Sequence, residues 1–121
     1  MMLRIKRIYD DVSDDDGYRV LVDRLWPRGV SKERAQLDAW KKSVAPSNEL
    51  RTWYHKGDGD WDGFKKAYVK ELEERDDDVQ ELLSIMDEHD IVTLLYAVKD
   101  RERNNAVVLK DYLEKVHGDE D

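Results

Sequence analysis

Hydrophobic residues run almost without interruption in two short segments of the chain, Val20–Val22 and Ile91–Tyr96. Apolar runs of this length are typical of strands that are buried on both faces, as in a parallel sheet. The first run predicts a strand over Tyr18–Asp23. A third segment, Leu3–Tyr9, opens with apolar and basic residues in alternation, which predicts a strand at an edge of the sheet.

Helices are predicted where apolar residues recur at helical spacing after a residue with a capping side chain. The predicted caps are Ser31 for a single turn, Ser47, Asp60, Asp78 (with Glu81, as a capping box) and finally Asn104 or Asn105. Strands separated by helices indicate parallel pairing with right-handed crossovers. We therefore expect one domain over residues 1–121, with a three-layer α/β fold whose small, mostly parallel sheet is flanked by helices.

Two acidic runs, Asp14–Asp16 and Asp76–Asp78, are interpreted as solvated turns. A calcium loop can be laid on Val12–Asp23, but its first ligand position would hold Val12, which cannot coordinate a metal. The motifs His-Glu-x-x-His and Gly-x-Ser-x-Gly do not occur. The sequence therefore predicts no metal site, and it indicates no particular cofactor.

Polar and aromatic side chains gather in the loops that follow the two buried strands. Because the carboxyl ends of parallel strands meet at one edge of a sheet, where α/β proteins bind ligands, we expect both loops to form one site. The second loop leads into the N-terminus of the last helix, whose free amides favour an anion. The candidate ligand-binding residues are Arg24, Trp26, Arg28, Tyr96, Lys99, Asn104 and Asn105.

Several of these side chains have an alternative, structural interpretation. Asp23 and Arg24 can form an ion pair that orders the loop, or Asp23 can hold the arginine toward a phosphate. Trp53 and Trp61 stand at helical spacing and are expected to pack in the core, whereas Trp26 lies in the loop and can stack on a base or a sugar. His55 is the best-placed histidine for acid–base chemistry, although the helix dipole alone favours a histidine at a helix end. Asp23 and His55 are the catalytic candidates.

Arg28 lies between Pro27, whose ring fixes the backbone φ angle, and Gly29, whose backbone is conformationally free. We expect its guanidinium group to face the cleft near Lys99. Two neighbouring cations without a counterion repel each other, and such a pair would attract phosphate or sulfate.

The composition and net charge of the chain limit the kinds of site and partner that we expect. The chain has 121 residues, no cysteine and a formal net charge of -8. Without cysteine, disulfides, a thiolate nucleophile and cysteine-ligated zinc are excluded. Double-stranded nucleic acid is not an expected partner, because duplex binding usually leaves a basic footprint. No apolar run is long enough to span a bilayer and no secretory-type segment opens the chain, so we expect a cytoplasmic protein without a membrane partner.

Several blocks of the sequence resemble the YeaO-like family of uncharacterised domains. They are Lys6–Tyr9, Ala45–Ser47, Glu49–Arg51, Val92–Ala97 and, most specifically, Arg19–Gly29 with its Val-Asp-Arg-Leu-Trp-Pro-Arg-Gly. The resemblance covers nearly the whole chain and implies a small α/β domain with no established activity. It also implies more distant relatives with a cysteine at the end of the last strand and Cys-His-Arg at the following helix. Tyr96 and Asn104–Ala106 stand in those places here, so thiol chemistry does not carry over.

Three functions are consistent with the sequence. The favoured one is the binding of a small anionic, phosphate-containing ligand or nucleotide at the carboxyl-terminal edge of the sheet. The alternatives are an enzyme that acts on a phosphate-containing or nucleic-acid substrate, with Asp23 or His55 as base, and a protein-interaction domain without a ligand. A short distance between His55 and the Asp23 loop would support the enzyme. An exposed apolar patch that contains Trp26 would support the protein partner.

Overall fold

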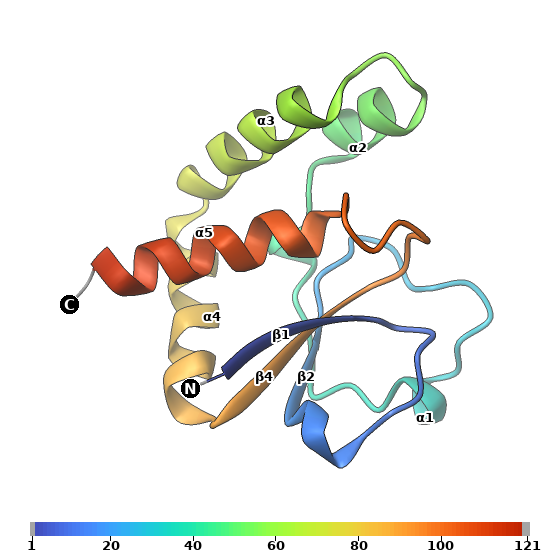
Figure 1. Ribbon diagram of the computed structural model, residues 1–121, viewed down its shortest axis with the longest axis vertical. Coiled ribbons are helices and arrows are strands. Elements are labelled where there is room, and N and C mark those ends of the chain that lie inside the picture. Colours follow the sequence, from blue (N-terminus) through green and yellow to red (C-terminus); the bar gives the residue numbers. More distant parts are fainter. Residues whose placement is uncertain (1, 120–121) are drawn as a thin grey trace.

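The computed structural model describes residues 2–119, in which four parallel strands form one sheet (Figure 1). The strands are β1 (Met2–Arg7), β2 (Tyr18–Leu21), β3 (Ala39–Trp40) and β4 (Ile91–Tyr96), in the spatial order β1-β4-β2-β3. The two apolar runs are therefore neighbours at the centre of the sheet, where Val20 pairs with Leu94. β1 forms an edge of the sheet, as its alternating pattern predicts.

Four helices share one core with the sheet (Figure 1). α4 (Asp76–Glu88) and α5 (Asn105–Asp119) pack directly against its strands, α3 (Trp61–Glu73) packs against these two helices, and α2 (Asn48–His55) packs against α3. Alternate strand residues point toward them, because successive side chains of a strand lie on opposite faces. The core between the sheet and these helices includes Val20, Val22, Leu94, Phe64, Tyr68, Leu72, Leu82 and Leu109, all buried. No helix in the described part of the chain is both long and apolar enough to cross a membrane.

The opposite face of the sheet is covered by a thinner layer, made of the loop after β2 and the one-turn helix α1 (Lys32–Ala35). Leu21 and Leu95 point to this side and pack against it. The indole rings of Trp26 and Trp40 lie there in an edge-to-face arrangement, with their centres 5.3 Å apart. The predicted three-layer α/β fold is therefore confirmed, and its third layer consists mostly of irregular chain.

Side-chain caps begin most of the helices where the sequence predicts them. The side-chain oxygens of Ser31, Ser47 and Asp60 each accept a hydrogen bond from the backbone amide three residues later. The first asparagine before α5 is the cap of that helix, since Oδ1 of Asn104 accepts a hydrogen bond from the amide of Val107 at 3.0 Å. These caps are local signals, which explains why the sequence alone locates them.

The acidic run Asp76–Asp78 is not a turn between two helices. α4 begins at its first residue, and the helix dipole favours all three carboxylates in the first turn. The capping box predicted from Asp78 and Glu81 is therefore wrong. The preceding residue, Arg75, makes no capping bond, and its guanidinium group donates to backbone carbonyls in the segment before α2.

The other acidic run, Asp14–Asp16, forms a short 3-10 helix, η1, and is only partly solvated. Asp16 is 1% exposed, whereas the two aspartates before it are exposed. Its carboxylate lies 2.6 Å from the guanidinium of Arg19 in β2 and 3.0 Å from the ammonium of Lys6 in β1. The solvated-turn interpretation is thus wrong for Asp16. The buried guanidinium group of Arg19 requires a counterion, and the Asp16 carboxylate is buried together with it.

Candidate functional site

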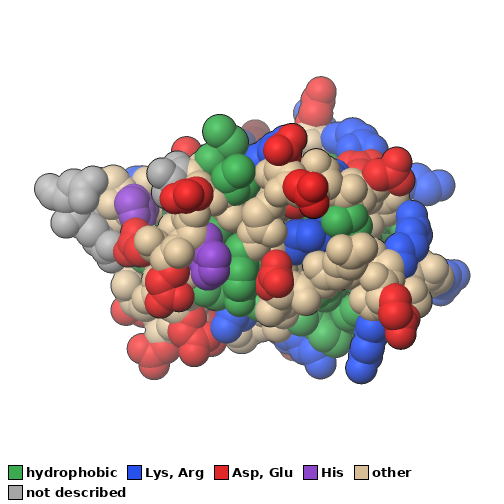
Figure 2. Space-filling view, turned by 90° about the horizontal axis from the view of Figure 1, so that it is seen from below, with side chains coloured by type: hydrophobic (Ala, Val, Ile, Leu, Met, Phe, Trp, Pro, Cys, Tyr) green, Lys and Arg blue, Asp and Glu red, His purple; other side chains and the backbone are tan. Residues whose placement is uncertain are grey.

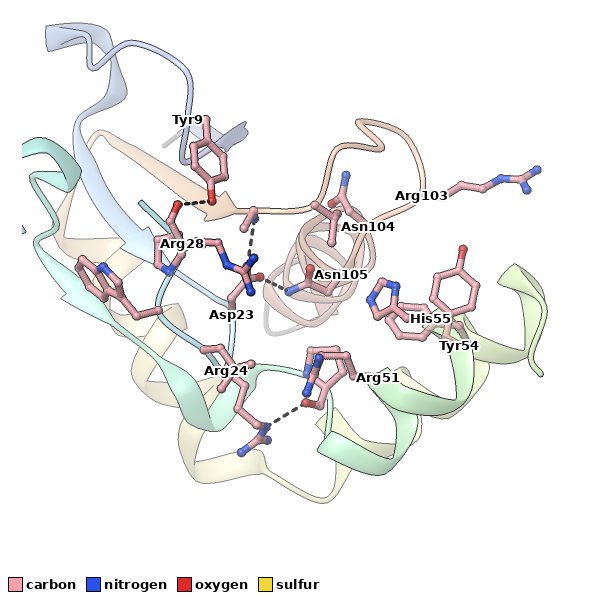
Figure 3. Close-up of a pocket in the computed structure, with 17 residues that line it drawn as sticks. Tyr9, Asp23, Arg24, Arg28, Arg51, Tyr54, His55, Arg103, Asn104 and Asn105 are labelled. Carbon is pink, nitrogen blue, oxygen red and sulfur yellow. Dashed lines mark hydrogen bonds between the residues drawn. The ribbon is translucent and has the colours of Figure 1, made fainter. Parts of the chain in front are cut away.

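A pocket of about 400 Å³ lies at the carboxyl-terminal edge of the sheet (Figure 3). Its walls come from the loop after β2, the loop after β4, the C-terminal half of α2 and the N-terminus of α5. Both loops that the sequence singles out therefore border one cavity. The volume falls in the lower part of the range of small-molecule sites, roughly 300–1,000 Å³.

Asp23 connects three walls of this pocket. One carboxylate oxygen accepts a hydrogen bond from the amide of Ala97 at 2.9 Å, and the other accepts one from Nδ2 of Asn105 at 3.1 Å (Figure 3). The same Asn105 nitrogen donates to the carbonyl oxygen of Val22 at 3.0 Å. Burial raises the pKa of Asp23 above its ordinary value, although the bonds from Asn105 and Ala97 and the charge of Arg51 act in the opposite direction.

Arg24 connects the loop after β2 to the segment before α2. Its Nε atom donates to the carbonyl oxygen of Pro46 at 3.1 Å, and a terminal nitrogen donates to that of Ala45 at 3.3 Å. Asp23 and Arg24 form no ion pair within residues 2–119, so the predicted pairing is wrong. Each of the two side chains binds backbone or amide groups instead, and the bonds of Arg24 give it a structural role.

Three arginines of the pocket have guanidinium groups that form no hydrogen bond with the protein, although the charge of Arg51 acts on Asp23 and that of Arg103 on Asp100. Of the ten arginines in the chain, all of them described, seven donate side-chain hydrogen bonds to carbonyl or carboxylate oxygens. The guanidinium groups of Arg28, Arg51 and Arg103 form no hydrogen bond or ion pair with any described residue, and all three residues border the pocket. The Nε atom of Arg51 is buried as well.

A buried N–H group without an acceptor is rare in folded proteins. Arg51 is half-buried, whereas Arg28 and Arg103 are exposed. Figure 3 shows the Arg103 side chain extending outward from the rim. Arg51 is therefore the unbonded cation inside the pocket, and Arg28 and Arg103 add charge at its surface.

The N-terminus of α5 borders the same pocket through Asn104 and Asn105. Within the described residues, the backbone amides of Asn105 and Ala106 have no acceptor, as is normal for a first helical turn. The partial positive charge of a helix N-terminus favours an anion at this position. The helix N-terminus and the arginines therefore both favour an anion in the pocket.

α2 and α3 contribute an aromatic wall, defined by Tyr54, His55 and Phe64. The Tyr54 ring stacks on that of Phe64 with their centres 4.7 Å apart, and the His55 ring lies 5.5 Å from Tyr54. Burial and the nearby charge of Arg51 lower the pKa of His55 below its ordinary value. His55 and Asp23 form no ion pair in the described structure, and Figure 3 draws Asn105 between them. A direct acid–base pair of these two groups is therefore not formed.

Positive charge dominates the pocket even though the protein is acidic. Four arginines and His55 line it, against the single carboxyl group of Asp23. The whole chain has 29 acidic and 21 basic residues. Figure 2 shows a similar unevenness on one face, where most visible Lys and Arg side chains lie toward the right-hand end. Among residues 2–119, no group of three or more His, Asp or Glu side chains could hold a metal ion.

The structure brings most of the predicted site residues together. The candidates that border the pocket are Asp23, Arg24, Trp26, Arg28, His55, Asn104 and Asn105. Tyr96 does not line it, because strand alternation places its ring with Leu94 in the core beneath the helices. Lys99 is exposed and does not line the pocket either. Arg28 does border the pocket, but the other cations that line it are Arg24, Arg51 and Arg103 rather than the expected Lys99.

Arg51 and Tyr54 are the main site residues that the sequence does not single out. Both lie on α2, where Leu50 and Tyr54 stand at helical spacing and suggest only core packing. One signal was available, because Glu49–Arg51 is among the blocks that resemble the YeaO-like family. The residue spacing also places Arg51, Tyr54 and His55 at i, i+3 and i+4, on one face of the helix.

Comparison with known families covers almost the whole chain. The family model described as the inactive DUF488-N3 subclade matches residues 2–121. The chain belongs to this subclade. YeaO, an uncharacterised protein of Escherichia coli strain K12, is 42% identical over 113 residues, which cover 93% of this chain and 97% of YeaO. Uncharacterised proteins of Mycobacterium bovis and Mycobacterium tuberculosis are each 40% identical over 111 residues, which cover 92% of both chains. The predicted YeaO-like family is confirmed, and no solved structure matches this member of the subclade.

Proposed function

We propose that this member of the inactive DUF488-N3 subclade binds a small phosphate-containing anion, such as a nucleotide, in the pocket at the carboxyl-terminal edge of its sheet. One observation carries the proposal: three guanidinium groups that form no hydrogen bond with the protein, those of Arg28, Arg51 and Arg103, all border this pocket. The guanidinium group suits this ligand, because its paired N–H donors match the oxygens of a phosphate.

The strongest single support comes from Arg51. Its Nε atom is buried without an acceptor, whereas its two terminal nitrogens are neither buried nor hydrogen-bonded. These terminal nitrogens would donate to one phosphate oxygen, and the amides of Asn105 and Ala106 would donate to a second. The arginine and the helix N-terminus would then bind the same anion.

An enzyme with Asp23 or His55 as its base has less support. Both carboxylate oxygens of Asp23 already accept hydrogen bonds, and these bonds connect the pocket walls. Among the described residues, the His55 side chain forms no hydrogen bond or ion pair with Asp23. The description of the family as inactive agrees with a binding function.

A protein-interaction domain without a ligand also has less support. The sequence-based test for it is an exposed apolar patch that contains Trp26. The indole of Trp26 is half-buried instead, its Nε1 atom donates to the carbonyl oxygen of Val30 at 2.7 Å, and its ring packs edge-on against Trp40. Leu25 is exposed at 59%, but one exposed leucine is normal for a protein surface.

The proposal is tested by thermal unfolding of the wild-type protein and two variants in the presence of inorganic phosphate, sulfate and nucleotides. At a ligand concentration 100 times its Kd, binding stabilises the wild type by about 2.7 kcal/mol. Arg28→Ala should abolish this stabilisation and leave the unliganded Tm nearly unchanged, because its guanidinium has no protein partner. Lys99→Ala removes the same charge just outside the pocket and should retain the stabilisation.

Salt gives a control for the electrostatic origin of the effect. The stabilisation should decrease as ionic strength rises, since exposed charges are screened beyond about 8 Å at physiological salt. No stabilisation of the wild type by any of these anions would refute the proposal. Equal losses in Arg28→Ala and Lys99→Ala would show that anions respond to net charge rather than to this pocket.

A further inference from the structure

We infer that the ligand of this pocket is a mononucleotide, whose phosphate lies at the unpaired arginines and whose base lies against the aromatic wall. The inference rests on the proposed function and adds the uncharged part of the ligand, which is the base. It assigns the rings of Tyr54, His55 and Phe64 a role in recognition rather than in packing alone.

The pocket has a cationic side and an aromatic side. Figure 3 shows Arg24 and Arg28 on one side of the pocket and Tyr54 beside His55 on the other. Arg51 lies four residues before His55 on the same face of α2, so about 6 Å along the helix axis separates the backbone positions that carry the charge and the ring. In a mononucleotide, a ribose similarly separates the phosphate from the base.

The aromatic side presents stacked rings. Tyr54 stacks on Phe64 at an angle of 28°, and Phe64 stacks on Trp61 at 17° with ring centres 5.6 Å apart. Phe64 is only 3% exposed, which holds the half-buried Tyr54 ring in place. A flat, uncharged ring can continue such a stack, and every nucleobase has a π face that does so. The geometry therefore predicts base binding without strong preference among the bases.

The size and lining of the pocket agree with one nucleotide. Inorganic phosphate would occupy only part of a cavity of about 400 Å³. Apolar side chains also line the pocket, namely those of Leu25, Pro27 and Val98, and they have no hydrogen-bond donor for a second phosphate. A sugar phosphate would satisfy the arginines but would leave the aromatic wall without a ring to stack on.

Isothermal titration calorimetry with adenosine 5′-monophosphate, ribose 5-phosphate and inorganic phosphate separates the two halves of the site. The nucleotide should bind at least about tenfold more tightly than ribose 5-phosphate, a difference of about 1.4 kcal/mol. This lies within the range found for a base stacked on an aromatic side chain. Arg51→Met should weaken all three ligands, since it removes the charge and keeps most of the side-chain volume.

Variants of Tyr54 test the placement of the base. Tyr54→Leu should lower the affinity for the nucleotide about tenfold and leave that for ribose 5-phosphate unchanged, whereas Tyr54→Phe should retain both. Tyr112→Leu is the matched control, because Tyr112 is a partly buried tyrosine in a separate groove between α3 and α5. It should leave the affinity for all three ligands unchanged.

Three outcomes would overturn the inference, and they differ in what they leave standing. Equal affinities for the nucleotide and ribose 5-phosphate would refute base recognition and leave the proposed anion site intact. Equal effects of Tyr54→Leu on these two ligands would refute the placement of the base at the aromatic wall. No measurable affinity for any of the three compounds would refute the proposed function together with the inference.

Discussion

Replacing Asp16 with Asn removes the carboxylate that pairs with two cations on the face of the sheet opposite the main helices. Asp16 is 1% exposed and bonds to Arg19 at 2.6 Å and to Lys6 at 3.0 Å. Removing one partner of a buried ion pair typically costs about 3–5 kcal/mol, because the other charge stays buried. Arg19 also donates to the carbonyl oxygens of Ala35 and Gln36, so we expect the lower value, about 3 kcal/mol.

Urea unfolding measures this loss as a lower midpoint at an unchanged m value. For a chain of 121 residues the entropy of unfolding is about 0.25 kcal/mol/K, so a loss of about 3 kcal/mol lowers Tm by about 12 °C. Asp14→Asn is the matched control, since it makes the same substitution at an exposed position of η1. It should change the free energy of unfolding by less than about 0.5 kcal/mol. Equal effects of the two substitutions would refute the buried network.

The pH dependence gives a second test of the same network. Burial alone would raise the pKa of Asp16, but the bonds from Ser13, Lys6 and Arg19 outweigh it and lower the pKa below its ordinary value. A carboxylate whose pKa is lowered on folding stabilises the protein above its unfolded pKa of about 4, and this stabilisation is lost as pH falls through the folded pKa. The difference between the wild type and Asp16→Asn should therefore be full at neutral pH and shrink below about pH 4. A difference that stays constant in strong acid would contradict this account.

Three further substitutions test other parts of the fold. Burial raises the pKa of Asp23, so the folded wild type holds this proton more tightly than the unfolded chain and loses stability as pH rises from about 4 through the folded pKa. Asp23→Asn should abolish this pH-dependent loss, and the same pH dependence of the free energy of unfolding in both proteins would contradict the prediction. Asn104→Ala should lower the free energy of unfolding by about 1 kcal/mol in urea titrations, since the amide of Val107 loses its cap, and an unchanged midpoint would count against the cap. Tyr68→Phe should cost about 1–2 kcal/mol in the same assay, because the buried carbonyl of Val44 loses its donor, and a neutral effect would show that this bond adds nothing.

The sequence predicts the parts of the fold that depend on local signals. The central strand Ile91–Tyr96 agrees with β4 at both ends, because a continuous apolar run has few other structures open to it. Ser47 and Asp60 cap their helices as predicted, since a cap depends only on residues within one turn. The edge between the carboxyl ends of β2 and β4 was also predictable, from the parallel arrangement alone.

The remaining features depend on contacts between distant segments. Asp16 looks like its neighbours in sequence, and only the packing of β1 against β4 and of β4 against β2 brings it between Lys6 and Arg19. Arg51 resembles any helical surface arginine until α2 is placed beside the loop after β2. Lys99 illustrates the reverse error, because the conformation of an exposed loop is not fixed by residue type.

Nitrogen-15 NMR during a titration with inorganic phosphate tests the central claim most directly, because it reports on each donor separately. We predict saturable shifts of the amide signals of Asn105 and Ala106, which have no protein acceptor, and of the Nε–H signal of Arg51, which belongs to the guanidinium group that the phosphate would contact. Signals from the groove around Tyr112 should not change. Shifts confined to residues outside the pocket, or no shift of the Arg51 Nε–H signal at saturating phosphate, would contradict the account.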